Sequence, residues 1–364
     1  RVMLRKAALA SAAFILALGA AELLLRAISF RPFAGPERQV TLIRPRPPPL
    51  EYDLVPGASG HAWGAQVSIN SLGFRGGEPR GERRPDILRV AVLGDSITFG
   101  NGLSEEQTFV NKLNEMPELK RFEFFNLAVG GYSVRNYAGR YDDLAEKIRP
   151  DLIVIAFCVN DAGLASINHG MLLLQDSMGA FYKSYLAQLL VFAAKRAGLT
   201  TVGWISNADK SFARYAAGEI EPLFDPRISR AMDELRNMGA ERLSEEEPLR
   251  WYASPIHVGF LRHWFARIGP EKMPVLVAAI PPLDENKQQL WALANGIISA
   301  LAAERSFQLL DLTPALSGAG LSRLRQRPID DIHLSADGHA LIANELASAL
   351  SRRAPTTSAS RRRE

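Results

Sequence analysis

The stretch Ile87-Leu88-Arg89-Val90-Ala91-Val92-Leu93-Gly94-Asp95-Ser96 decides the fold of this chain. Its apolar run has the length and composition of a buried strand, and the glycine permits a sharp bend because it carries no Cβ. Ser96 then falls where a helix begins, with backbone N–H groups facing outward. A serine on such a turn is a candidate nucleophile if a base and an oxyanion site accompany it. Taken alone, Gly-Asp-Ser is also a common turn composition.

Four further apolar runs predict four more strands. With Leu88–Leu93, the expected strands are Phe122–Leu127, Leu152–Phe157, Val275–Ile280 and Phe307–Leu312. Helical patterns separate them, and the clearest are Asn136–Ile148, Asn286–Arg305 and a last helix from about Asp337 to Arg352. Strands that alternate with helices pair in parallel, so we expect an α/β fold with a five-stranded parallel sheet.

The histidine best placed to be a base is His333. The chain has six histidines, and this one follows the last predicted strand and stands three residues after Asp330. A carboxylate at that spacing reaches the imidazole within one local turn and fixes its tautomer. Asp331 is the adjacent alternative. In an open parallel sheet, sites form at the carboxyl ends of the strands, where both Ser96 and His333 fall.

Two loops that follow strands offer donors for an oxyanion. Gly131 offers a bare backbone N–H, and Asn160 offers a side-chain NH2 group. Together with the Ser96 N–H they make three donors for one charge, and loss of one such donor costs roughly 10²–10³ in turnover. Each also has a plainer interpretation, because the glycine can mark a loop and Asn160-Asp161 can cap a helix.

The order of these blocks resembles the SGNH (GDSL-like) hydrolases. The blocks are Gly94-Asp95-Ser96, Gly131, Asn160-Asp161 and Asp330 with His333, and the resemblance covers roughly Ile87 to Arg352. The strings Gly94–Gly102 and Asn70–Arg75 look like the membrane-linked bacterial branch of that family. One position departs from the family pattern, because Cys158 stands where a glycine is usual two residues before the asparagine.

The resemblance implies a flavodoxin-like three-layer α/β/α fold and ester hydrolysis or acyl transfer by a Ser-His-Asp set. The nucleophile would be Ser96, and the base and its orienting carboxylate would be His333 and Asp330. The oxyanion donors would be Ser96, Gly131 and Asn160. Asp95 is interpreted as a turn residue beside the site.

A metal site is an alternative interpretation of one cluster near the C-terminus. Its members are Asp330, Asp331, His333, Asp337 and His339. The sequence shows no second ligand cluster of matching spacing, and acyl transfer through a serine needs no metal. We therefore expect neither a metal nor an organic cofactor. The single cysteine excludes an internal disulfide and has the pattern of a buried small residue.

The N-terminus carries a membrane signal. Residues 1–6 form a basic flank, and residues 7–29 are almost wholly apolar except for Glu22 and Arg26. A cleaved signal peptide and an uncleaved anchor share this pattern. Including Leu23–Leu25 brings the apolar length near the ~20 residues that span a bilayer, which favours an anchor. The basic flank then stays in the cytoplasm and the remainder lies in the periplasm, or is secreted if the N-terminus is cleaved.

The rest of the chain divides into three parts. Residues 30–86 form a Pro-rich linker and N-terminal extension, in which Arg44–Pro49 should be extended and stiff enough to lift the enzyme off the membrane. Residues 87–352 form the hydrolase domain, and residues 353–364 a disordered basic tail. Within the domain, residues 162–272 interrupt the strand–helix alternation with helical patterns. This insertion is either a lid over the site or a packing element.

Composition is that of a globular protein, with 47% hydrophobic and 23% charged residues. The net charge of +4 is spread along the chain, so no nucleic-acid partner is expected. The expected partners are an acyl ester or acylated glycan, the membrane and envelope polysaccharide-modifying proteins. An esterase for O-acetyl or short acyl esters of envelope glycans is the preferred function. A polysaccharide O-acyltransferase and a non-catalytic glycan-binding or scaffold subunit are the alternatives, and a binding module has no need for a serine, histidine and carboxylate set.

Overall fold

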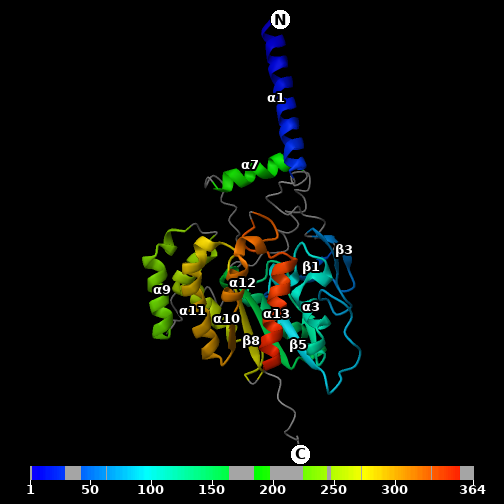
Figure 1. Cartoon of the computed structure of the whole chain (residues 1–364), viewed down its shortest axis with the longest axis vertical. Helices are drawn as coiled ribbons and strands as arrows, with labels where there is room; N and C mark the ends of the chain where they lie inside the picture. The colour runs from blue at the N-terminus through cyan, green and yellow to red at the C-terminus, as the bar shows by residue number, and fades with distance from the viewer. Residues whose placement is uncertain are drawn as a thin grey trace, which may run out of the picture.

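The computed structural model describes residues 2–28, 42–62, 64–163, 184–196, 224–243, 247–271, 273–328 and 330–352. A five-stranded sheet lies at the centre of the molecule, with helices on both of its faces, and a long N-terminal helix projects away from this body (Figure 1).

The central sheet has the order β6-β5-β7-β8-β9, and each neighbouring pair is parallel. Its strands are β5 (Leu88–Leu93), β6 (Phe122–Asn126), β7 (Leu152–Cys158), β8 (Val275–Ile280) and β9 (Gln308–Asp311). The predicted α/β fold is therefore confirmed, with five parallel strands at the expected runs. The chain reverses its direction of winding at β5, whose neighbours are β6 and β7. Such a switch point opens a crevice at the carboxyl ends of these strands.

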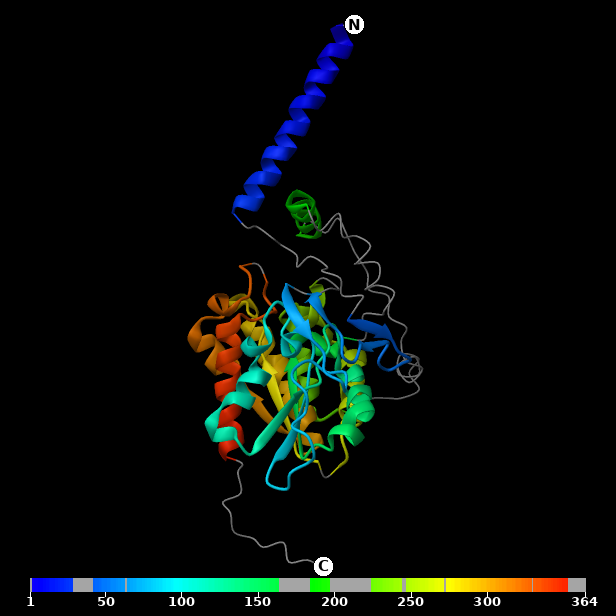
Figure 2. The same ribbon diagram turned by 90° about the vertical axis from the view of Figure 1, so that its right-hand side faces the viewer.

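Each face of the sheet carries its own apolar core. Ala91 and Leu93 face one core, whereas Val90 and Val92 face the other, as the alternation of a strand requires. The first core is covered by α4 (Val134–Ile148), α9 (Pro226–Asn237), α10 (Pro255–Phe265) and α11 (Gln288–Glu304). The second core is covered by α3 (Phe109–Glu115), α12 (Thr313–Ala319) and α13 (Ala336–Arg352). The three-layer arrangement is visible in Figure 2.

The later part of the predicted insertion belongs to one of these helical layers. Helix α10 lies between β7 and β8 in the chain and packs on α4 and α11, so it covers the sheet as a crossover helix does. Ile228, Tyr252 and Phe265 are all buried in the first core. Between residues 224 and 271 the described segments contribute to the packed core, and the 162–272 insertion stays a prediction. Residues 164–183 and 197–223, on which most of the lid hypothesis rests, lie outside the described residues.

The N-terminal extension folds against the body. Strands β1 (Ile43–Pro45) and β2 (Tyr52–Leu54) form an antiparallel pair, and β3 (Ser59–Ala62) and β4 (Ala65–Ser68) form a hairpin. Leu54 is fully buried, and buried Asp53 forms an ion pair with buried Arg140 of α4. Of the stretch Arg44–Pro49, expected to be extended, residues 44–45 lie in β1 and residues 48–49 lie in a turn. The stretch contacts α4, where Arg46 pairs with Asp143 and the Pro49 carbonyl accepts the Asn136 amide.

Arg75 ties the same extension to the loop that follows Ser96. Its guanidinium group donates hydrogen bonds to the carbonyls of Phe99 (2.7 Å), Gly100 (2.8 Å) and Leu103 (2.5 Å). The side chain is buried, so these carbonyls have few other donors available. The Asn70–Arg75 motif therefore acts as a clamp between the extension and the turn that carries the serine.

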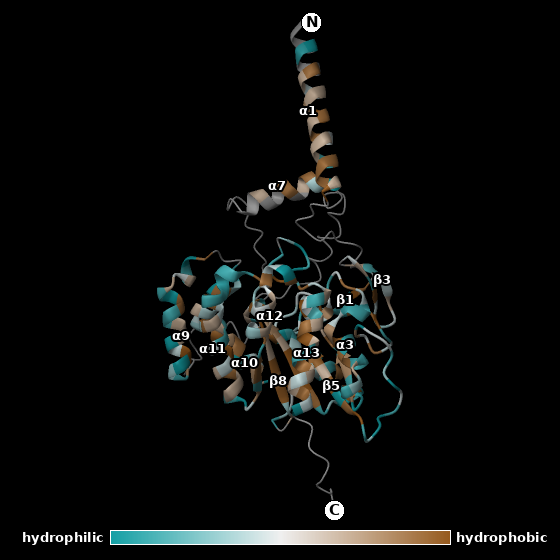
Figure 3. Ribbon diagram, in the orientation of Figure 1, coloured by the Kyte–Doolittle hydropathy of each residue, from teal (hydrophilic) through white to brown (hydrophobic). Residues whose placement is uncertain are grey.

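Helix α1 (Val2–Ala27) has one 19-residue stretch, Leu9–Ala27, that is long and apolar enough to cross a membrane, and a signal sequence meets the same criteria. The apolar colouring runs along this helix in Figure 3. Helix α7 (Tyr185–Arg196) lies across its inner end (Figure 1). The Glu22 carboxylate accepts hydrogen bonds from the backbone N–H groups of Tyr185 (3.0 Å) and Leu186 (2.8 Å), so it caps the start of α7.

Candidate active site

The Ser96 turn is built by close packing and a cap. A Cβ on Gly94 would lie only 2.1 Å from Thr98 Oγ1, so the turn has room for glycine alone. Buried Asp95 caps the short helix α2 (Ser96–Phe99) by accepting the Ile97 N–H at 2.8 Å. Ser96 is thereby presented, part-exposed, at the carboxyl end of β5. The sequence prediction of a strand–serine–helix turn is confirmed in its geometry.

His333 and Asp330 meet Ser96 from the far end of the chain. His333 Nε2 lies 2.9 Å from Ser96 Oγ, across 237 residues of sequence. His333 Nδ1 lies 2.9 Å from Asp330 Oδ2, and the His333 backbone N–H donates to Asp330 Oδ1 at 2.9 Å. With its Nδ1 proton donated to the carboxylate, the imidazole presents Nε2 as an acceptor for the serine hydroxyl.

The electrostatics of this pair favour a protonated imidazole when the serine gives up its proton. Burial by itself would lower the pKa of His333, but the hydrogen bond and charge of Asp330 outweigh it, and the pKa is raised. Burial likewise opposes the charged form of Asp330, and its bonds to His333 overcome this, so its pKa is lowered. Each partner therefore stabilises the ionised form of the other.

The other acidic and histidine residues of the C-terminal cluster have separate partners. Asp331 accepts a hydrogen bond from Lys287 Nζ at 2.8 Å, which leaves Asp330 as the carboxylate on the imidazole. His339 is buried on α13, where its Nδ1 accepts the Phe109 N–H at 3.1 Å. Burial lowers the pKa of His339 to about 3. The cluster that admitted a metal interpretation is thus divided between three different sets of contacts.

Asn160 reaches the site from the end of β7. Its Nδ2 donates to Asp95 Oδ2 at 3.0 Å, and its Oδ1 accepts the Cys158 thiol at 2.8 Å. These two contacts fix which way the amide faces. Asp95 Oδ2 also lies 3.3 Å from Ser96 Oγ, so one carboxylate oxygen touches both the amide and the hydroxyl. The amide of Asn160 is consequently held beside the serine, as an oxyanion donor must be.

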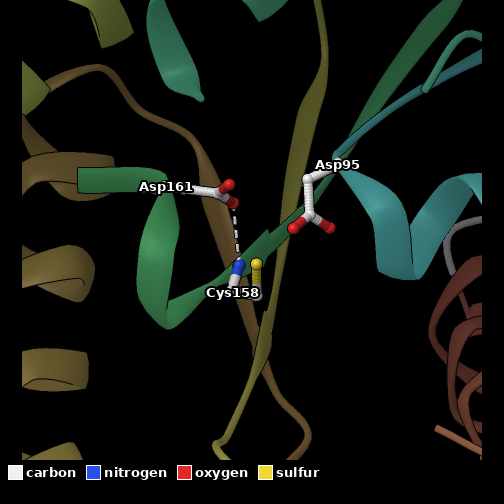
Figure 4. Close-up of side chains that lie close together, drawn as sticks. All are labelled: Asp95, Cys158 and Asp161. Atoms are coloured by element: carbon white, nitrogen blue, oxygen red, sulfur yellow. Dashed lines mark hydrogen bonds between the residues drawn. The ribbon is translucent and has the colours of Figure 1, made fainter. Parts of the chain in front are cut away.

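Asp95, Cys158 and Asp161 form a buried group beneath these residues (Figure 4). Asp161 accepts the Cys158 N–H at 2.8 Å and the Tyr137 hydroxyl at 2.6 Å. Burial and then the charge of Asp95 raise the pKa of Asp161 well above its usual range. Burial also raises the pKa of the Cys158 thiol, so Cys158 stays a neutral donor and not a nucleophile. Through these bonds the three side chains hold the end of β7 and the Asn160 amide in position.

Gly131 lies in the loop after β6, next to the serine. A Cβ placed on the adjacent Gly130 would lie 3.8 Å from Ser96 Cβ. Gly131 itself has φ +80°, a left-handed conformation that suits glycine. The Gly130 carbonyl accepts a hydrogen bond from the Tyr52 hydroxyl of the N-terminal extension. The described contacts bring Ser96, His333 and Asp330 together, with Asn160 joined through Asp95, and they place Gly130, the neighbour of Gly131, beside Ser96.

The fold and this site together define a serine hydrolase of the α/β/α type, in which a serine, a histidine and a carboxylate form a hydrogen-bonded series. Residues 92–341 match the model of the GDSL-like lipase/acylhydrolase family. The chain belongs to this family, and it is a carboxylic ester hydrolase of the GDSL (SGNH) type.

Solved structures with similar folds include several esterases. A lipase/acylhydrolase from Enterococcus faecalis is 15% identical, with a TM-score of 0.40, and the match covers 75% of this chain and 100% of that one. The acetylxylan esterase Axe2 from Geobacillus stearothermophilus is 14% identical with a TM-score of 0.38, covering 72% and 93%. The esterase EstA from Pseudoalteromonas sp. is 12% identical with a TM-score of 0.36, covering 73% and 97%. No match is found among curated proteins. Because these identities and scores are low, membership rests on the family match.

Two residues beside the triad make contacts that the sequence did not specify. Asp95, expected as a turn residue beside the site, accepts both the Ile97 N–H of the helix cap and the Asn160 amide. Tyr52 touches the glycine loop from a segment that the sequence pattern assigned to a linker. The neighbour of a candidate nucleophile offers a signal for the first, whereas a contact across 78 residues offers none for the second.

Proposed function

We propose that Ser96, His333 and Asp330 act as a catalytic triad. His333 Nε2 takes the Ser96 proton as Ser96 Oγ attacks an ester carbonyl, and Asp330 stabilises the imidazolium that forms. The N–H groups of Ser96 and Gly131 and the Asn160 amide receive the oxyanion. His333 then protonates the departing alcohol. Water, with its proton taken by the same imidazole, releases the acid and restores the serine.

One observation carries this proposal. The two 2.9 Å contacts of His333, to Ser96 Oγ through Nε2 and to Asp330 Oδ2 through Nδ1, put acceptor and donor at the distances that proton transfer needs. A binding or scaffold subunit has no use for this alignment, so the enzymatic role is preferred over the non-catalytic alternative.

The proposed substrates are O-acetyl or short acyl esters on envelope glycans. The His333 side chain is 28% exposed, and Ser96 is also part-exposed. A site this close to the surface admits a small acyl group while a bulky alcohol, such as a sugar chain, stays outside. The same exposure lets water reach the acyl-enzyme, which supports hydrolysis over transfer to a second glycan.

We also propose that α1 anchors the enzyme, as in the membrane-linked branch that the Asn70–Arg75 motif resembles. Glu22 supports an uncleaved helix, because it caps α7 and bonds Arg26 of its own helix at 2.8 Å. The whole of α1 would then belong to the mature protein. The body would lie in the periplasm, with α1 as its membrane partner.

Labelling by a fluorophosphonate tests the triad. The wild-type chain should be labelled at Ser96, whereas Ser96→Ala and His333→Ala should not be labelled. A Ser96→Ala variant that keeps its ester hydrolysis would refute the assignment.

Product analysis tests the substrate and the reaction. The enzyme is incubated with an acetylated glycan, and separately with an acyl donor plus the deacetylated glycan. Free acetate in the first mixture supports the esterase, and acyl-glycan in the second supports the acyltransferase. Hydrolysis of long-chain esters with no activity on either glycan would refute the proposed substrate class.

A further inference from the structure

Tyr52 reaches the glycine loop of the active site from the N-terminal extension. It lies on β2 and its hydroxyl donates to the Gly130 carbonyl. The side chain is only 1% exposed. Burial, and then the charge of Asp95, raise the pKa of Tyr52, so the hydroxyl keeps its proton and remains a donor at any working pH. Because a buried hydroxyl without a partner is costly, the Tyr52 hydroxyl favours the arrangement in which the Gly130 carbonyl stays bonded to it.

The acceptor is one end of a peptide group whose other end is the candidate oxyanion donor. In a trans peptide the carbonyl of one residue and the N–H of the next point in opposite directions. When Tyr52 holds the Gly130 carbonyl, the Gly131 N–H of the same rigid unit must point away from Tyr52. Gly130 itself packs against Ser96, at 3.8 Å between a Cβ on Gly130 and Ser96 Cβ.

This peptide needs a restraint, because it lies between two glycines. Glycine adopts positive and negative φ with similar ease, so a Gly-Gly peptide can rotate about its flanking bonds with little steric opposition. Gly131 already has φ +80°. Rotation by half a turn would replace the N–H in the site with a carbonyl oxygen, which repels an oxyanion.

Tyr52 is itself held firmly enough to impose the restraint. Its ring packs edge-on against Tyr132, with centroids 5.3 Å apart, and the Tyr132 hydroxyl donates to the Tyr52 carbonyl at 2.5 Å. Strand β2 is fixed below by the buried ion pair of Asp53 with Arg140. Tyr52 of the extension therefore bonds the Gly130 carbonyl of the loop, and Tyr132 of the loop bonds the Tyr52 carbonyl.

We propose that Tyr52 is a positioning residue for the hydrolase reaction, and that its hydrogen bond to Gly130 keeps the Gly131 N–H directed at the oxyanion. This rests on the proposed function, in which Gly131 is an oxyanion donor. The N-terminal extension is then part of the active site and not only a connection to the membrane helix.

The test uses Tyr52→Phe in the full chain, which removes one oxygen and keeps the ring. We expect kcat to fall about 10- to 100-fold with KM changed less than about 2-fold. In part of the enzyme molecules the Gly131 N–H would no longer face the oxyanion, and this donor acts in the transition state. Labelling of Ser96 by a fluorophosphonate should slow by a similar factor. The matched control is Tyr132→Phe, which removes a hydroxyl from the same buried pair. It keeps the Gly130 carbonyl bonded, and it keeps the ring packing and the Asp53–Arg140 ion pair that hold Tyr52, so kcat should stay within about 3-fold.

The outcomes separate the two proposals. If Tyr52→Phe and Tyr132→Phe lower the melting temperature alike and neither changes kcat, Tyr52 has only a structural role and the inference is wrong. If Ser96→Ala retains activity, the proposed triad fails whatever Tyr52 does. An inactive Ser96→Ala, together with a selective kcat loss in Tyr52→Phe, supports both.

Discussion

Replacement of Asp330 by asparagine should disable the base while leaving the loop folded. Asp330 Oδ1 accepts the backbone N–H groups of Ile332 (3.1 Å) and His333 (2.9 Å), and Oδ2 faces His333 Nδ1. An asparagine that keeps its oxygen on the two backbone donors must turn its NH2 group toward Nδ1. The imidazole then takes the other tautomer, with its proton on Nε2, and can no longer accept the Ser96 proton.

The size of the loss follows from these contacts. A fixed wrong tautomer costs roughly 10⁴-fold in kcat in triads of this type. Turning the amide over restores the tautomer but sacrifices two backbone hydrogen bonds at about 1 kcal/mol each, so the competent population is about 30-fold smaller. We therefore expect kcat of Asp330→Asn to fall by between ~30-fold and ~10⁴-fold.

The pH profile gives an independent reading of the same variant. Catalysis needs neutral His333, so wild-type kcat/KM is lost as the pH falls through the raised pKa of this imidazole. Asparagine removes the charge that raises it, so the acid limb should move to lower pH. Asp331→Asn is the matched control, because Asp331 faces Lys287, and its kcat should change less than about 3-fold. A large loss in Asp331→Asn with an active Asp330→Asn would refute the reasoning.

Three further predictions concern stability. Gly94→Ala places a Cβ 2.1 Å from Thr98 Oγ1 and should lower the free energy of unfolding by about 1–3 kcal/mol, which a urea titration of both proteins measures. Arg75→Met removes the guanidinium donor from the buried Phe99 and Leu103 carbonyls, whereas the Gly100 carbonyl keeps the Leu103 N–H. The substitution should cost about 2 kcal/mol in the same titration, and an unchanged midpoint would contradict the proposed clamp. Folded His339 has its pKa lowered to about 3, so the unfolded state binds the extra proton below its ordinary 6.5, and the free energy of unfolding should fall as the pH drops between these values. His339→Asn keeps an acceptor for the Phe109 N–H but does not titrate, so thermal melts across that range should show a shallower slope.

Much of the sheet could be predicted because four of its strands, β5 to β8, are almost wholly buried, whereas β9 is partly exposed. A parallel strand covered on both faces reads as a continuous apolar run, as Leu152–Phe157 does, and such runs need no knowledge of their partners. The serine turn was equally local, since Gly94 and Asp95 act on residues within four positions. The Asp330–His333 spacing was local as well. The approach of His333 to Ser96 could be inferred from the strand ends at which both fall and from the family's block order.

The extension was harder to predict because its strands are short and mixed in polarity. β1 and β2 have three residues each and include Pro45 and Asp53. Asp53 looks like a surface residue until Arg140 is placed against it by α4. When a residue is buried because of an ion pair with a distant residue, the sequence shows no hydrophobic periodicity that would reveal the burial.

The separation of 237 residues between Ser96 and His333 has a consequence for biosynthesis. A chain made from its N-terminus produces the proposed nucleophile early and its base late, after the last strand of the sheet. Until the His333 loop reaches Ser96, the serine lacks its imidazole base, and esters in the compartment of synthesis are not attacked. Under the proposed triad, ester hydrolysis therefore begins only once the C-terminal part of this domain has folded.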